Sequence, residues 1–112
     1  MIDISVGIKL FNESDYFSAH DFFEDLWMNA DHNEKEFFQG LVQISVGCYH
    51  LICGNMKGAE SQLTKGKNKL IKFEPNFYRI DLVTLNSKIN FLLKNLTHLE
   101  ITNKIPIIEL TT

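Results

Sequence analysis

The chain has 112 residues, of which 45% are hydrophobic, and its formal net charge at pH 7 is −3. This length and composition predict one globular domain over residues 1–112, which buries roughly two-thirds of its unfolded surface without metals or disulfides. The acidic charge argues against a nucleic-acid binder, which needs a basic face. Arg79 is the single arginine, which disfavours bidentate recognition of phosphates or carboxylates.

Cellular location is predicted from what the sequence lacks. The N-terminal residues contain no basic region followed by an apolar run, so no secretory signal is expected. The most apolar window, residues 41–53, is interrupted by polar side chains and is too short to span a bilayer. Cys48 and Cys53 are five residues apart on one predicted helix and point in different directions. We therefore expect a soluble cytoplasmic protein with reduced thiols and no membrane partner.

The first segment fits two interpretations. Its apolar residues alternate strictly, which is typical of a strand: Ile2, Ile4, Val6, Ile8 and Leu10. However, Ile4, Ile8 and Phe11 also share one face of a helix, and no second strand is evident that could pair with this segment. A helix is therefore favoured.

The second and third helices are the clearest. Ser14 or Asp15 can cap the second helix, which runs to about Ala30, because their side-chain oxygens accept from the N–H groups of the first turn. The third helix runs from about Glu34 to Cys53 and is apolar nearly all round, as is typical of a central helix. The loop between them is short, which predicts antiparallel neighbours.

The remaining elements follow from caps and apolar spacing. Gly54 suits the left-handed position that ends the third helix, and Asn55 can cap the fourth. The fourth (56–73) and fifth (82–99) predicted helices have apolar residues spaced three and four apart, and Pro75 ends the fourth. The tail, which contains Pro106, is expected to be extended on the bundle. The sequence predicts an all-α single-domain bundle of about five helices, with the antiparallel hairpin of the second and third helices at its centre.

Two stripes of polar and aromatic residues form the candidate binding cluster: His20, Glu24 and Trp27 on the second helix, and Gln39, Gln43 and His50 on the third. In an antiparallel hairpin these stripes face each other, with His20 near His50, Glu24 near Gln43 and Trp27 near Gln39. An unpartnered buried carboxylate or imidazole is destabilising, so we expect these side chains to satisfy one another.

The same residues resemble a known family. The stretch HDFFEDLW, residues 20–27, is similar to the His-x-x-x-Glu-x-x-Trp signature of the family called domain of unknown function 309. The similarity continues through residues 37–63, with a Gln-Gly-hydrophobic-hydrophobic-Gln run at 39–43 and a Gly-Asn-x-x-Gly-Ala turn at 54–59. It covers about residues 11–73, and Asp21 departs from the glutamate more common in the family. The resemblance implies a small multihelical bundle and no established biochemical activity.

Three interpretations of the cluster stay open. It is a polar network that fixes helix register, a pocket in which His20 and Glu24 act as an acid/base couple, or a metal site with His50 as third ligand. The metal site is disfavoured because the additional inward carboxylates of a two-metal helical bundle are missing. No metal and no cofactor are therefore predicted.

The functional prediction is a non-enzymatic module for a small ligand or a protein partner. The alternative is a small enzyme that uses Glu24 and His20 as an acid/base pair, with or without a metal. A solvent-open cavity beside these two residues would favour the enzyme, and a closed, hydrogen-bonded cluster would favour the module.

Self-association is left open. A basic stripe, Lys65, Lys69 and Lys72, is interpreted as a solvated face that complements the helix dipole.

Overall fold

The computed structural model describes residues 3–98 and 100–111, which form five α-helices, two short 3-10 helices and a two-stranded hairpin. In chain order the elements are α1 (Ser5–Asn12), α2 (Tyr16–Asn29), α3 (His32–Ile52), α4 (Met56–Leu70), the 3-10 helix η1 (Ile71–Phe73), β1 (Asn76–Phe77), β2 (Ile80–Asp81), α5 (Leu82–Lys94) and the 3-10 helix η2 (Ile101–Lys104). The predicted helical bundle is confirmed. Ile2 and Leu99, which belong to two of the predicted apolar patterns, lie outside the described residues.

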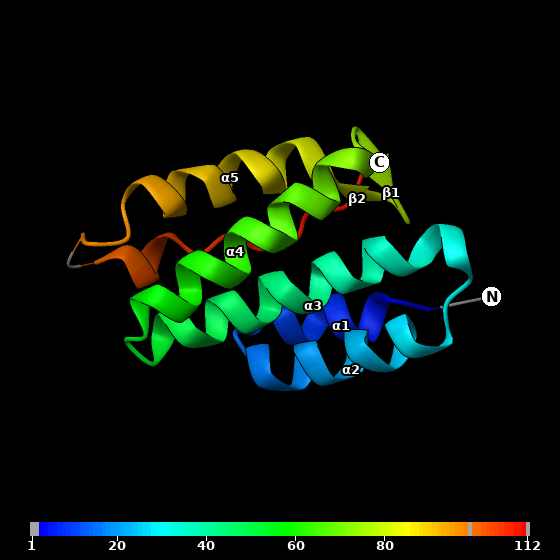
Figure 1. Cartoon of the computed structure of the whole chain (residues 1–112), viewed down its shortest axis with the longest axis horizontal. Coiled ribbons are helices and arrows are strands. Elements are labelled where there is room, and N and C mark those ends of the chain that lie inside the picture. The colour runs from blue at the N-terminus through cyan, green and yellow to red at the C-terminus, as the bar shows by residue number, and fades with distance from the viewer. Residues whose placement is uncertain (1–2, 99, 112) are drawn as a thin grey trace.

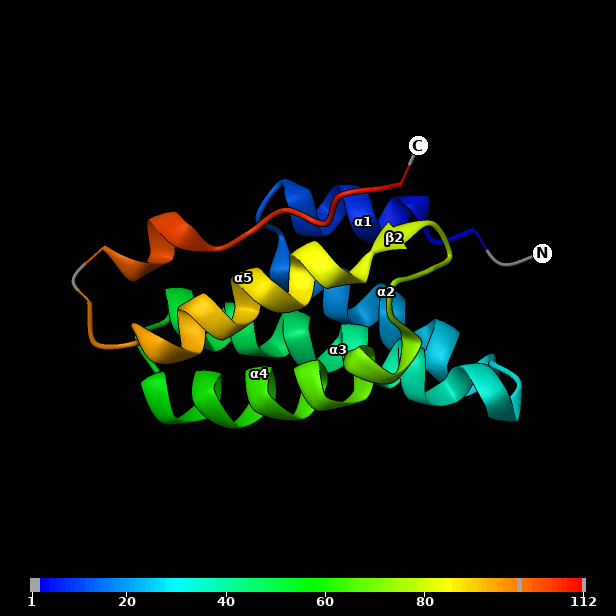
Figure 2. The same cartoon turned by 90° about the horizontal axis from the view of Figure 1, so that it is seen from above.

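The helices form two layers. Figure 1 shows α2, α3 and α4 side by side with α3 in the middle, and Figure 2 shows α1 and the C-terminal segment behind them, with α5 running obliquely from the level of α4 towards α1. The most extensive contacts join α3 to α4 and α2 to α3, which confirms the central position of the α2–α3 hairpin. No helix within residues 3–98 and 100–111 is long and apolar enough to cross a membrane.

The first segment is helical, as predicted. Ile8 and Phe11 are buried on one face of α1, whereas Val6 on the opposite face is 50% exposed. The helix lies close to α2, because a Cβ atom built on Gly7 would stand 2.5 Å from Cε1 of Phe23. Burial of one helical face therefore outweighs the strand-like alternation of this segment.

The predicted caps of the central helices are present. The side chain of Asp15 accepts a hydrogen bond from Ser18 N at 3.2 Å and begins α2. Gly54 has φ of +81° after α3, and the side chain of Asn55 accepts from Gly58 N at 2.9 Å to begin α4. These residues fix where the helices of the front layer begin and end.

The contact between α3 and α4 depends on glycine. A Cβ atom on Gly40 would lie 2.9 Å from Cδ2 of Leu70, and one on Gly47 would lie 2.7 Å from Cδ2 of Leu63. On α4, a Cβ atom on Gly66 would lie 2.9 Å from the backbone oxygen of Gly40. Without side chains at these points, the two helix backbones approach closely.

The β1–β2 hairpin differs from the sequence prediction, which contains no strand. Its turn residues Tyr78 and Arg79 have φ of 49° and 63°, as a two-residue type I′ turn requires. Tyr78 is held by tertiary contacts: its ring stacks on Phe37 with centroids 5.8 Å apart, and its hydroxyl donates to Glu34 Oε2 at 2.8 Å. Partial burial and this hydrogen bond raise the pKa of Tyr78 to about 12. Since Asn and Gly are the usual residues of such turns, this one has no sequence signature.

The C-terminal segment after η2 is extended and lies on the bundle, as predicted. It pairs with β2, where Asp81 N donates to Glu109 O at 2.8 Å. Its other edge contacts the end of α1, where the side chain of Asn12 accepts from Ile108 N at 2.7 Å and donates to Ile108 O at 3.0 Å. The segment is thus fixed between the hairpin and α1.

Candidate functional site

The six predicted site residues lie in the layer of α2, α3 and α4, and each is partly buried: His20, Glu24, Trp27, Gln39, Gln43 and His50. The opposite side of α3 is fully buried through residues such as Phe38, Ile44 and Leu51. We call the solvent-exposed side of this layer the outer face. The site candidates therefore occupy a surface of the molecule and not its core.

As the middle helix, α3 divides its exposed side between two neighbours. Residues seven apart on a helix lie about 20° apart around its axis, because seven residues are nearly two full turns. One such set on α3 lies towards α2: Lys35, Val42 and Tyr49. The adjacent set lies towards α4: Glu36, Gln43 and His50. Gln39 and Val46 fall between these two sets.

The edge towards α2 is made of aromatic and cationic contacts. Lys35 Nζ donates to the backbone oxygen of Trp27 at 3.0 Å and lies 5.9 Å from the centre of its ring. At the other end of the pair, the rings of Phe17 and Tyr49 meet edge to face with centroids 5.8 Å apart. These two contacts confirm that α2 and α3 are antiparallel.

The edge towards α4 is made of hydrogen bonds and an ion pair. Gln43 Oε1 accepts from Lys69 Nζ at 2.9 Å, and Glu36 pairs with Lys72 at 2.6 Å. His50 lies over α4, since a Cβ atom on Gly58 would stand 2.9 Å from Cδ2 of its ring. Gln43 and His50 thus contact α4, whereas the sequence interpretation directed them towards α2.

The expected coupling of His20, Glu24 and Gln43 is not formed. His20 Nδ1 is hydrogen-bonded to the backbone oxygen of Phe17 in its own helix at 2.7 Å. Within residues 3–98 and 100–111, the side chains of Glu24 and Gln39 have no hydrogen bond or ion pair. Partial exposure explains this, because water can solvate these groups and removes the need for an internal partner.

A chain of ring contacts crosses the outer face from α2 to α3, and we call these four residues the aromatic cluster: Phe17, His20, Tyr49 and His50. Centroid distances are 5.2 Å from Phe17 to His20, 5.8 Å from Phe17 to Tyr49 and 6.4 Å from Tyr49 to His50. Phe17 is 59% exposed and Tyr49 is 39% exposed. Sequence reasoning misses both, although Phe17 precedes His20 by three residues on the same stripe of α2.

The side chains that could bind a metal ion do not converge on one site in the part of the chain that the structure describes. Among residues 3–98 and 100–111, no three His, Cys, Asp or Glu side chains stand close enough to hold a metal ion. His20, Glu24 and His50 therefore do not form the three-ligand set considered from the sequence. Burial raises the pKa of the Cys48 thiol well above its usual range, which disfavours the thiolate that binds metals.

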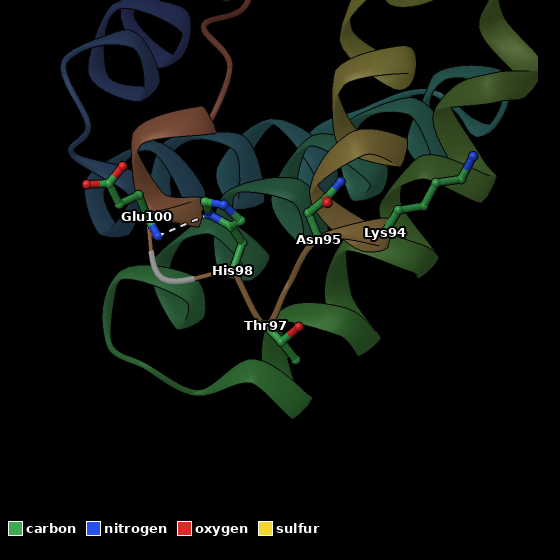
Figure 3. A pocket seen from close by; sticks show the side chains of 5 residues that line it. All are labelled: Lys94, Asn95, Thr97, His98 and Glu100. Atoms are coloured by element: carbon green, nitrogen blue, oxygen red, sulfur yellow. Dashed lines mark hydrogen bonds between the residues drawn. The ribbon is translucent and has the colours of Figure 1, made fainter.

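Four cavities among the described residues lie away from the aromatic cluster. One of about 670 Å³ lies at the turn after α5. Figure 3 shows the side chains that line it: Lys94, Asn95, Thr97, His98 and Glu100. Glu100 N donates to His98 Nδ1 there at 3.3 Å. Three smaller cavities involve α5, the C-terminal segment and α1. None of these four is lined by a predicted site residue, so none of them supports the acid/base interpretation.

Fold and surface together define a small two-layer helical bundle whose polar and aromatic residues lie on an open face. The sequence model of a protein family, described as domain of unknown function (DUF309), matches residues 4–62. This match covers more than half of the chain. The chain belongs to this family, as its resemblance predicts. The match includes α1, which the resemblance did not, and ends within α4. No curated protein matches the chain significantly.

Proposed function

We propose that this protein is a non-enzymatic interaction module that binds a protein partner through the outer face of α2, α3 and α4. The observation that carries the proposal is the exposed contact between Phe17 and Tyr49. Large aromatic side chains that remain exposed and touch each other are typical of interaction surfaces, where burial by a partner removes apolar area from water.

The surroundings of the aromatic pair support this function. Aromatic residues dominate the binding energy of interfaces, whereas polar and charged residues form the rim. Here His20 and His50 flank the pair, and Asp21 is exposed nearby on α2. The arrangement resembles a small apolar centre with a hydrophilic border.

The shape of the surface favours a protein over a small molecule. Small-molecule sites are concave and bury most of their ligand, and catalytic acid/base groups must converge on a reacting atom. The cavities described above lie elsewhere, and His20 and Glu24 are not hydrogen-bonded to each other. An open helical face instead suits a partner that covers it.

The test is site-specific photocrosslinking in living cells that express the protein. A photoreactive phenylalanine analogue replaces Phe17 in one variant and Phe91 in a control, since Phe91 is 50% exposed on α5 in the other layer. We expect discrete crosslinked products from position 17, identified by mass spectrometry, that disappear when Tyr49→Ser is added. Equal products from both positions, or none from position 17, would contradict the proposal.

A further inference from the structure

Charge is segregated across the outer face. Helix α2 contains Asp21, Glu24 and Asp25 and no lysine or arginine. On the other side of α3, Lys65, Lys69 and Lys72 recur at spacings of four and three residues and so share one side of the α4–η1 segment. The contacts of Lys69 with Gln43 and of Lys72 with Glu36 place this stripe beside the exposed side of α3. Lys35 and Glu36 lie on α3 between the two flanks and are bound within the chain by Trp27 O and Lys72. Apart from these two residues, the face has an acidic flank along α2 and a basic flank along α4–η1.

We propose that the partner on the outer face is a second copy of this chain, related by a two-fold axis parallel to α3. The inference rests on the proposed function and names its partner. A half-turn about such an axis exchanges the two flanks, so each acidic α2 lies against the basic α4 of the other copy. An axis across the helices would instead oppose α2 to α2 and α4 to α4. Charge favours the first arrangement and disfavours the second.

The residues that meet are also at matching positions along the helices. Phe17 contacts Tyr49, and the neighbouring His50 lies over Gly58, so these residues mark one end of the layer. Trp27 contacts Lys35, and the neighbouring Glu36 pairs with Lys72 at the other end. Rotation about an axis parallel to α3 leaves positions along the helices unchanged. The acidic residues 21–25 and the lysines at 65 and 69 both lie between these ends, so they come opposite one another.

The aromatic cluster also has a defined counterpart in the same arrangement. Phe17 is 59% exposed at one end of the layer. The part of α4 at that end exposes Ser61, a small residue. The aromatic cluster of one copy therefore meets this end of α4 in the other copy, while the charged stretches meet further along. In the centre of the proposed interface, α3 of one copy faces α3 of the other copy, with Gln39 and Val46 on the facing sides.

Charge reversal tests this arrangement. Asp21 and Lys65 are exposed, and within residues 3–98 and 100–111 neither side chain has a hydrogen bond or an ion pair. Reversing either one should therefore leave the fold intact. In the proposed dimer, residue 21 of each copy faces residue 65 of the other. Asp21→Lys therefore places two positive charges opposite each other at both α2–α4 contacts, and Lys65→Glu places two negative charges opposite each other. Each variant should raise the dissociation constant about tenfold or more.

Mixing the two variants gives the decisive measurement. A dimer of one Asp21→Lys chain and one Lys65→Glu chain has opposite charges at both contacts, so the equimolar mixture should dimerise as the unmodified protein does. Sedimentation velocity over a concentration series measures this, with the dimer at twice the chain mass of 13.0 kDa. Glu100→Lys and Lys104→Glu, which lie outside the front layer, are the matched controls and should not change association. If circular dichroism shows that Asp21→Lys does not fold, Asp25→Lys replaces it.

Three results would overturn the inference: an unmodified protein that stays monomeric, a dimer that tolerates both reversals, or a mixture that does not recover. These outcomes are separable from failure of the proposed function. Crosslinks from position 17 to a different protein, combined with a monomer in sedimentation, would retain the interaction module and remove the second copy. Absence of both would remove both proposals.

Discussion

The two sides of α3 are built differently. Towards α4, glycines bring the backbones together, and side chains of α3 are joined by a hydrogen bond to α4 and by an ion pair to η1. Towards α2, the aromatic rings of Phe17 and Tyr49 meet edge to face, and both remain exposed at the contact. The α4 side is organised for stability, whereas the α2 side leaves apolar surface and polar groups open to a partner.

The largest expected effect is at the close contact of α3 with α4. Gly66→Ala places a methyl group 2.9 Å from the backbone oxygen of Gly40, which a side-chain movement cannot relieve. We expect the free energy of unfolding to fall by roughly 1–3 kcal/mol. Denaturant unfolding measures this, with Ser61→Ala at an exposed position of the same helix as the control. A variant as stable as the control would show that the glycine contact is not required.

A smaller effect is expected where α2 ends. Lys35→Met keeps most of the aliphatic side chain but removes the hydrogen bond to Trp27 O and the cation over the Trp27 ring. It also removes a positive charge from the C-terminal end of α2. The expected loss of stability is about 0.5–1.5 kcal/mol in denaturant unfolding. Lys65→Met is the control and should change stability by less than about 0.5 kcal/mol.

The polar contact between α3 and α4 should give a measurable coupling. In a double-mutant cycle of Gln43→Leu and Lys69→Met, the two changes should be non-additive by about 0.5 kcal/mol, because each removes the same hydrogen bond at 2.9 Å. The variants keep side-chain volume, so packing changes little. Strict additivity would show that the bond does not persist in solution.

The smallest effect is expected for the coupling free energy between His20 and Glu24, the two residues of the predicted acid/base pair. His20→Ala and Glu24→Ala should be additive within about 0.3–0.5 kcal/mol, because no hydrogen bond joins the two side chains and both are partly exposed. This expectation reverses the coupling that burial of both groups would impose. A coupling above about 1 kcal/mol in denaturant unfolding would restore the idea of a linked pair.

Most helix positions could be predicted from the sequence because they depend on local chemistry, although the fifth helix ends at Lys94 and not at the predicted residue 99. Asp15 and Asn55 cap through their own side chains, and Gly54 supplies the left-handed residue after α3. The hairpin could not be predicted, because its turn is held by contacts that are distant in sequence: Tyr78 contacts α3, and Arg79 is hydrogen-bonded to Thr111 in the C-terminal segment. Tertiary packing there overrides local propensity.

The positions of the candidate site residues could be predicted only in part from helical spacing. Helical spacing correctly groups His20, Glu24 and Trp27, since one helix alone determines that stripe. It cannot tell which of two neighbours Gln43 contacts, because α3 has a helix on each side. Gly40 and Gly47 are seven residues apart on α3, and this spacing is the signal that α4 packs closely along α3. Polar residues of α3 on that side, such as Gln43, therefore contact α4.

The side chain of Asn12 has a consequence for aggregation. One edge of the C-terminal segment pairs with β2, and an extended segment normally leaves its other edge open to strands of other molecules. Asn12 offers an acceptor and a donor to Ile108, as a neighbouring strand would, but it belongs to a helix that cannot extend the sheet. A single amide therefore blocks edge-to-edge pairing at that residue, and Asn12→Ala should make the protein more prone to form fibrils that bind thioflavin T.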